Sequence, residues 1–226
     1  GTLFENAYST SPSTLPSSVA MLTGEYSNAI AFQNKTKGQG DAATEDYLFM
    51  VPDARILLAE KIKANGYATA ASVENRALLH SNVLQGFQLL DQRMVEELVD
   101  NVRSEPFYIL KWFMDPHGPY SPPEKYVKKI DVDWEHLPRK LEFYTTAWAA
   151  ELGKLLRTGE LNRAELDAVR ALYRAEVEWM DERVGRILSR LEQSGAMEHT
   201  IIVFTADHGE MLGKHNKIGH GKEFWE

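Results

Sequence analysis

Two stretches of the sequence combine residue types that can bind a metal ion or an anion. In the first, residues 205–210 read Thr-Ala-Asp-His-Gly-Glu and follow the β-branched run 200–205. A carboxylate and an imidazole can both ligate a divalent cation, and the glycine lets the backbone turn tightly around it. Ligand sites in open α/β sheets lie beyond the carboxyl ends of strands, so Asp207 and His208 are candidate metal ligands. The alternative is an ordinary polar strand end.

In the second stretch, residues 115–123 read Asp-Pro-His-Gly-Pro-Tyr-Ser-Pro-Pro after another apolar run. Proline fixes its own φ angle, so this loop is expected to be rigid and irregular. Such a loop can hold His117 in place for binding or proton transfer. The alternative is a proline-rich turn in which His117 has a purely local role.

A third candidate is a hydroxyl near a helix start. Residues 14–24 read Thr-Leu-Pro-Ser-Ser-Val-Ala-Met-Leu-Thr-Gly, and a short helix is expected over 17–23, with Pro16 suited to a first helical position. Helix N-termini favour anions such as phosphate or sulfate. A nearby metal could lower the pKa of the Thr14 hydroxyl and make it a nucleophile. Taken alone, Thr14 is better explained as an ordinary helix cap.

Composition excludes several classes of protein. The 226 residues include no cysteine, which removes a disulfide scaffold, a thiolate zinc site and a cysteine nucleophile. Any metal must therefore sit on oxygen or imidazole ligands. The net charge of −8 gives no support to nucleic-acid binding. No uncharged apolar run reaches the length of roughly 18 residues that a transmembrane helix needs.

Helical and extended patterns alternate along the chain, which is typical of an α/β protein. The pattern predicts a loop over 25–52, a helix from an Asp53 cap to Asn65-Gly66, a helix over 94–103 and partial helix over 134–158. Asn162 with Glu165 offers a capping start for a long helix that Gly195 ends. Strands are expected over 67–73, over 107–114 as a central strand buried on both faces, and over 200–205. The strand ends would then bring the candidate residues together into a site that binds an oxyanion ester.

In this order and spacing, the motifs resemble the sulfatase family of the alkaline phosphatase superfamily. Residues 4–8, 14–24, 115–123, 173–195 and 200–210 each resemble a family segment, as do Gln85-Gly86-Phe87 and the region around His215 and His220. The resemblance implies an α/β fold with a mixed sheet flanked by helices. It also implies a single catalytic domain over 1–226, incomplete at both ends, without the family's N-terminal metal-ligand strand and its C-terminal part.

Residue roles follow from the same resemblance. Thr14 occupies the nucleophile position and also contacts the metal, while Asp207 and His208 occupy metal-ligand positions. His117 and His220 occupy catalytic and substrate-binding positions, and the role of His215 stays open. The implied cofactor is a divalent cation: Ca²⁺ for a sulfatase, or Mn²⁺, Mg²⁺ or Zn²⁺ for phosphoryl transfer.

Two departures from the family pattern bear on the substrate. Typical sulfatases convert a cysteine or serine nucleophile into formylglycine, which is not expected of Thr14, and the signature arginine is Ser18 here. We therefore expect a metal-dependent hydrolase of sulfuric or phosphoric esters. The alternatives are phosphodiesterase or glycerophosphotransferase-type phosphoryl transfer, and a non-catalytic relative that binds an anion or glycan. The expected substrates are small-molecule, glycan or lipid sulfate or phosphate esters, and the expected location is periplasmic or otherwise extracytoplasmic.

Overall fold

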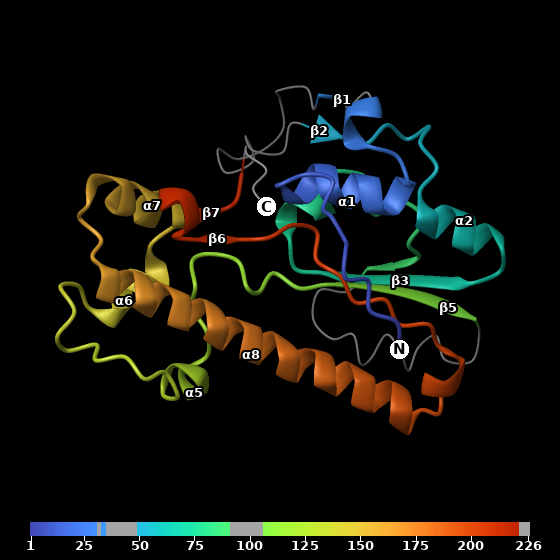
Figure 1. Ribbon diagram of the computed structural model, residues 1–226. Helices are drawn as coiled ribbons and strands as arrows, with labels where there is room; N and C mark the ends of the chain where they lie inside the picture. The colour runs from blue at the N-terminus through green and yellow to red at the C-terminus, as the bar shows by residue number, and fades with distance from the viewer. Residues whose placement is uncertain (31–32, 35–48, 91–105, 222–226) are drawn as a thin grey trace. The chain divides into compact units, whose positions relative to one another are not determined.

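The computed structural model describes residues 1–30, 33–34, 49–90 and 106–221 (Figure 1). The chain divides into two compact units. Unit 1 comprises Gly1–Trp112, Arg190–His208 and Lys222–Glu226, and unit 2 comprises Phe113–Ser189 and Gly209–Gly221. Strands and helices alternate along the chain, which confirms the α/β class.

Unit 1 contains a three-stranded parallel sheet in the order β4-β3-β5. Its strands are β3 (Ala68–Val73), β4 (Leu89–Leu90) and β5 (Phe107–Trp112). β3 pairs with β5 from Ala68 opposite Phe107 to Val73 opposite Trp112. The strand expected over 67–73 is thus confirmed as the middle strand of the described sheet, and its buried small side chains suit that position.

Helices of unit 1 pack on this sheet, with α1 and α2 on the same side of β3 and β5 in Figure 1. They are α1 (Thr14–Thr23), α2 (Leu58–Ala64) and α3 (Arg76–Leu79). Their buried side chains form one apolar core with β3, which includes Val19, Leu22, Leu57, Val73 and Leu78. Full burial of such a side chain contributes about 1.5–3 kcal/mol, so this core holds the start of α1 firmly against the sheet.

Two expected helix starts are placed differently by the structure. α1 begins at Thr14 rather than at residue 17, so Pro16 lies in the first turn, where a missing N–H costs no helical hydrogen bond. Asp53 does not cap α2, because Glu60 Oε2 instead accepts a hydrogen bond from the Leu57 N–H at 2.8 Å. That hydrogen bond satisfies a backbone N–H at the start of the helix at Leu58.

The strand expected over 200–205 is absent from the structure, and β5 is not a central strand of the described sheet. Residues 201–206 are exposed, and Ile201–Phe204 make no backbone hydrogen bond to other described residues. β5 pairs only with β3 among the described strands, and its six residues are half-buried rather than buried on both faces. A β-branched sequence favours extended backbone, but a strand forms only where a neighbour completes its hydrogen bonds.

Unit 2 is mainly helical. Its helices are α5 (Glu124–Val127), α6 (Leu141–Thr146), α7 (Ala149–Thr158) and most of α8 (Arg163–Gln193). An antiparallel ribbon of β6 (Met211–Leu212) and β7 (Ile218–Gly219) flanks a tight turn, η4 (Lys214–Asn216). The core includes the fully buried side chains of Tyr120, Tyr144, Leu152, Val169 and Leu172.

The long helix α8 confirms its local signals. The Asn162 side chain accepts from the Glu165 N–H at 3.0 Å, and Glu165 accepts from the Asn162 N–H at 3.0 Å, which completes the expected capping box. Gly195, with a φ of 74°, follows the end of the helix. Among the apolar side chains that recur along the helix at steps of three and four, Leu166, Val169 and Leu191 are buried, whereas Val177 is 36% exposed.

Shorter elements complete the described chain. They are η1 (Ser27–Ala29), η3 (Met197–His199) and an antiparallel pair of β1 (Gln33–Asn34) and β2 (Phe49–Met50). Apart from these, the expected 25–52 loop lies largely outside the described residues, and so does the helix expected over 94–103. No helix in the described ranges is both long enough and apolar enough to cross a membrane.

Candidate active site

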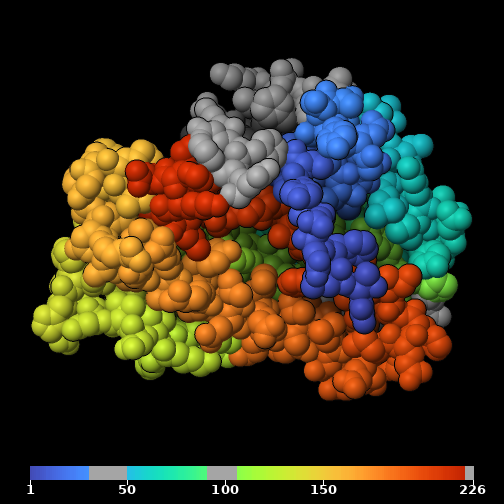
Figure 2. Space-filling view, in the orientation of Figure 1, coloured from blue at the N-terminus to red at the C-terminus, as the bar shows by residue number. Residues whose placement is uncertain are grey.

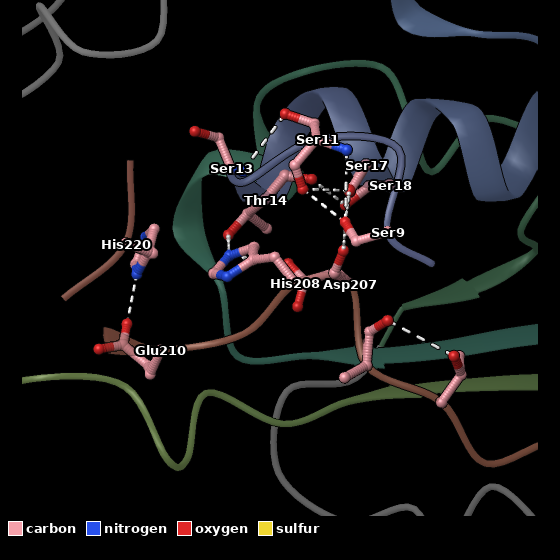
Figure 3. Close-up of polar contacts among 12 residues, drawn as sticks. Ser9, Ser11, Ser13, Thr14, Ser17, Ser18, Asp207, His208, Glu210 and His220 are labelled. Atoms are coloured by element: carbon pink, nitrogen blue, oxygen red, sulfur yellow. Dashed lines mark hydrogen bonds and ion pairs between the residues drawn. The ribbon is translucent and has the colours of Figure 1, made fainter. Parts of the chain in front are cut away.

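In unit 1, the start of α1 and residues 207–208 bring three polar side chains together (Figure 3). Thr14 is the first residue of α1, and its Oγ1 lies 3.1 Å from His208 Nε2. The same nitrogen lies 3.3 Å from Asp207 Oδ2. These side chains are largely buried, with exposed fractions of 8% for His208 and 18% for Asp207. Three of the residues expected to act together are therefore in contact.

The arrangement around His208 differs from a hydroxyl–imidazole–carboxylate relay. In the latter arrangement, the hydroxyl and the carboxylate bind opposite ring nitrogens, so that the carboxylate orients the imidazole, which takes the proton of the hydroxyl. Here Thr14 and Asp207 both approach Nε2. The three side chains instead contribute two oxygen atoms and one nitrogen atom, all of kinds that can ligate a cation.

This donor set can be tested against a divalent cation. Carboxylate, hydroxyl and imidazole suit Ca²⁺, Mg²⁺, Mn²⁺ or Zn²⁺ in kind, so Thr14, Asp207 and His208 fit as part of a cation site. The set contains only one carboxylate. Within the described ranges, no group of three or more His, Cys, Asp or Glu residues is gathered in a way that could hold a metal ion.

A serine cluster fixes the backbone around Thr14. Ser9 Oγ lies 2.9 Å from Ser17 Oγ and donates to the Asp207 carbonyl at 2.5 Å. Ser17 is 1% exposed and donates to the Ser11 carbonyl at 3.0 Å. Although the first residues of the chain lie on the surface in Figure 2, these bonds connect them to both α1 and Asp207. The supporting roles of Ser9 and Ser17 could not be predicted from the sequence, because single serines carry no distinctive pattern.

Ser18 occupies the position of the family's signature arginine, and the structure shows what it does instead. Its side chain is fully buried, and Oγ donates to the Thr14 carbonyl at 2.6 Å, four residues earlier in α1. Ser18 therefore satisfies a backbone acceptor inside the helix. This hydrogen bond supports the backbone of Thr14, whose hydroxyl is the candidate nucleophile.

In unit 2, the other two candidate histidines form a pair. The rings of His117 and His220 are edge to face, with centroids 4.9 Å apart and an interplanar angle of 66°. His117 Nδ1 lies 2.6 Å from the Gly118 carbonyl, so this nitrogen carries the proton in order to donate. The 115–123 loop and the residue that follows β7 thus place two imidazoles together, and their role in substrate binding stays a prediction.

Glu210 connects this pair to the core of unit 2. Its Oε1 forms a short hydrogen bond with His220 Nδ1, shown in Figure 3, and its Oε2 accepts from the Tyr120 hydroxyl at 2.7 Å. Tyr120 is fully buried, and burial together with the charge of Glu210 raises the pKa of its hydroxyl. Glu210 ends the Thr-Ala-Asp-His-Gly-Glu motif of residues 205–210, but its role could not be predicted from the sequence. Its partner lies 90 positions away in the sequence, which no local pattern could reveal.

His215 lies in the η4 turn, where its backbone has a φ of 55° and its side chain is exposed. A positive φ is uncommon for a residue with a side chain, and histidine tolerates it better than most. The role of His215 in the site stays open.

Comparison with known proteins identifies the family of this chain. The Sulfatase family model matches residues 1–226. An arylsulfatase of Clostridium perfringens is 31% identical over 136 residues, which are 57% of this chain and 28% of that protein. Two solved structures are each 18% identical: a phosphonate monoester hydrolase of Agrobacterium radiobacter (TM-score 0.63, 96% of this chain and 57% of that one) and a 2-O GAG sulfatase (TM-score 0.64, 98% and 53%).

The chain therefore spans less than two thirds of each of these proteins. At 18% identity, the two solved structures show a shared fold, and this fold agrees with the α/β arrangement expected from the sequence. The match of the family model over the whole chain decides the family. The chain belongs to the sulfatase family.

Proposed function

We propose that this protein hydrolyses esters of sulfuric or phosphoric acid, with Thr14 as the nucleophile. The observation that carries the proposal is the position of the Thr14 hydroxyl at the N-terminus of α1, 3.1 Å from His208 Nε2 and next to Asp207. A helix N-terminus favours the negative charge of an ionised hydroxyl and of a sulfate or phosphate group.

In the proposed reaction, Thr14 Oγ1 forms a bond to sulfur or phosphorus and the bond to the leaving-group oxygen breaks. Water then hydrolyses the sulfated or phosphorylated threonine and restores the hydroxyl. A divalent cation held by Asp207 and His208 would lower the pKa of the Thr14 hydroxyl. His117 and His220 would donate hydrogen bonds to the non-bridging oxygens or a proton to the leaving group.

Phosphoryl transfer, as in a phosphodiesterase, is a second candidate, and two residues favour it. Thr14 replaces the cysteine or serine from which formylglycine is made, and the chain has no cysteine at all. Ser18 carries no charge, and its buried hydroxyl donates to the Thr14 carbonyl. Ser18 therefore cannot supply the positive charge of the signature arginine. An arylsulfatase among the relatives and a phosphonate monoester hydrolase among the structural neighbours are consistent with either ester.

Parallel assays of the full natural protein with an aryl sulfate, an aryl phosphate and an aryl phosphodiester would separate the two chemistries. Each is measured before and after chelation and with divalent cations restored. Thr14→Ala should lower turnover by several orders of magnitude. Thr23→Ala is the matched control, because this threonine lies in the same helix and its hydroxyl makes only local contacts, donating to the Val19 carbonyl at 2.7 Å and accepting from the Glu25 N–H at 3.1 Å.

Turnover unchanged in Thr14→Ala would contradict the nucleophile, and ligand binding without any turnover would favour the non-catalytic alternative. Fast sulfate turnover with an unmodified threonine would reject the preference for phosphoryl transfer.

A further inference from the structure

The loop that carries His117 is fastened to α8 at both of its ends. Arg183 Nη1 donates to Asp115 Oδ2 at 2.7 Å, and the Ser121 N–H donates to Glu176 Oε1 at 2.6 Å. Glu176 and Arg183 are seven residues apart, which places them about two turns apart on the same face of the helix. One face of α8 therefore holds the loop on both sides of His117, through a clamp that consists of the Arg183–Asp115 and Glu176–Ser121 contacts.

The position of this loop also determines that of His220. Tyr120 lies in the same loop, packs edge to face on Tyr173 of α8 with ring centroids 5.6 Å apart, and donates to Glu210. Glu210 in turn accepts from His220 Nδ1, and the His220 ring packs against His117. A shift of the loop would thus be transmitted to both imidazoles through direct contacts.

Glu176 is an unusual residue to find in this clamp. It is only 3% exposed, and its Oε2 has no hydrogen-bond partner in the part of the chain that the structure describes. The pKa of Glu176 is raised to about 8, chiefly by burial and also by the charges of Asp115 and Glu210, while the Ser121 N–H acts in the opposite direction. The titratable groups that interact with it are Asp115, Tyr120, Tyr173 and Glu210, and Asp115 is itself paired with Arg183.

A second buried glutamate on the same helix shows the contrast. Glu165 is fully buried, but it accepts from Arg139 at 2.5 Å, from the Tyr144 hydroxyl at 2.8 Å and from the Asn162 N–H at 3.0 Å. Its carboxylate is fully engaged by the fold. Glu176 has one such bond, and that bond holds the His117 loop.

We propose that Glu176 and Arg183 are positioning residues, which hold the Asp115–Ser121 loop and through it fix the His117–His220 pair for binding the oxyanion of the substrate. The inference rests on the proposed function for the role of the two histidines. The clamp itself rests on the contacts within unit 2. The histidine signals, which report on the clamp, and the turnover of the ester, which reports on the proposed function, can therefore fail separately.

The test uses the full natural protein with selectively ¹³C-labelled histidine and compares Glu176→Ala, Glu176→Gln and Glu178→Ala. Glu176→Ala should shift the ring signals of both His117 and His220 and raise KM for the ester at least about tenfold, with a smaller change in kcat. Glu176→Gln keeps an acceptor for the Ser121 N–H and should restore both readouts. Glu178→Ala removes an exposed carboxylate from the same helix and should change neither.

Arg183→Ala provides a second, independent disturbance of the clamp and should shift the same two ring signals. Unchanged histidine signals in folded Glu176→Ala and Arg183→Ala would overturn the proposal, and so would a failure of Glu176→Gln to restore them. If the histidine signals shift as expected but the wild-type protein turns over no ester, the positioning role stands and the proposed function fails.

Discussion

Replacement of Glu176 by glutamine should make the stability of the protein less dependent on pH. The carboxyl is buried, and its pKa is raised from the ordinary 4.5 to about 8. Between these values the folded protein keeps a proton that the unfolded chain releases, so the free energy of unfolding falls as pH rises. Each pH unit corresponds to about 1.4 kcal/mol, which gives on the order of 5 kcal/mol across the window.

Glutamine binds no proton in either state, so the free energy of unfolding of Glu176→Gln should not fall in this way as the pH rises. Near pH 5, glutamine resembles the protonated carboxyl, and the two proteins should be similarly stable. The difference in unfolding free energy, variant minus wild type, should then grow by about 1.4 kcal/mol per pH unit up to pH 8.

Urea unfolding followed by circular dichroism at four pH values between 5 and 8.5 measures this difference. The control is Glu178→Gln, which removes a carboxylate that is 56% exposed on the same helix, and its difference should show no such slope. A flat difference for Glu176→Gln would refute the reasoning, since it would mean that the buried carboxyl is ionised in the folded protein throughout the range.

Three further predictions concern other parts of the fold. Glu165→Gln should cost about 3 kcal/mol in urea unfolding at pH 7, because Arg139 loses a buried partner; a cost below about 1 kcal/mol would contradict this. Gly219→Ala should lower the melting temperature by several degrees, because φ is +93° and the new Cβ would lie 2.6 Å from Ala149 Cβ; an unchanged melting temperature would contradict the strain. Phe204→Lys should reduce self-association of the 226-residue chain in sedimentation without loss of stability. The Phe204 side chain is 71% exposed, and Ile201–Phe204 make no backbone hydrogen bond to other described residues. Equal self-association would contradict it.

The elements that the sequence predicted correctly are those specified by nearby residues. Asn162 and Glu165 cap each other three positions apart, and the apolar spacing after them defines α8 without reference to any other part of the chain. The 67–73 strand was equally clear, because small and β-branched residues follow an Asn-Gly helix end. The run 200–205 carries the same local signal but has no backbone partner among the described residues, so its pattern alone was misleading.

The candidate site shows the same limit. Thr14, Asp207 and His208 could be predicted because each sits in a recognisable motif, and the structure brings them together. Glu176 carries no motif, and its partner Ser121 lies 55 positions away in the sequence. The partners of Tyr120 and Ser9 are similarly distant, so the supporting residues of a site become visible only once the chain is folded.

The central claim is that Thr14 forms a covalent intermediate with the transferred group. The most direct measurement is acid quenching of the full natural protein during turnover of an aryl sulfate or aryl phosphate, followed by peptide mapping by mass spectrometry. The account predicts one sulfo or phospho group on the peptide that contains Thr14, and none in Thr14→Ala. Steady turnover with Thr14 unlabelled, or turnover that survives Thr14→Ala, would contradict it.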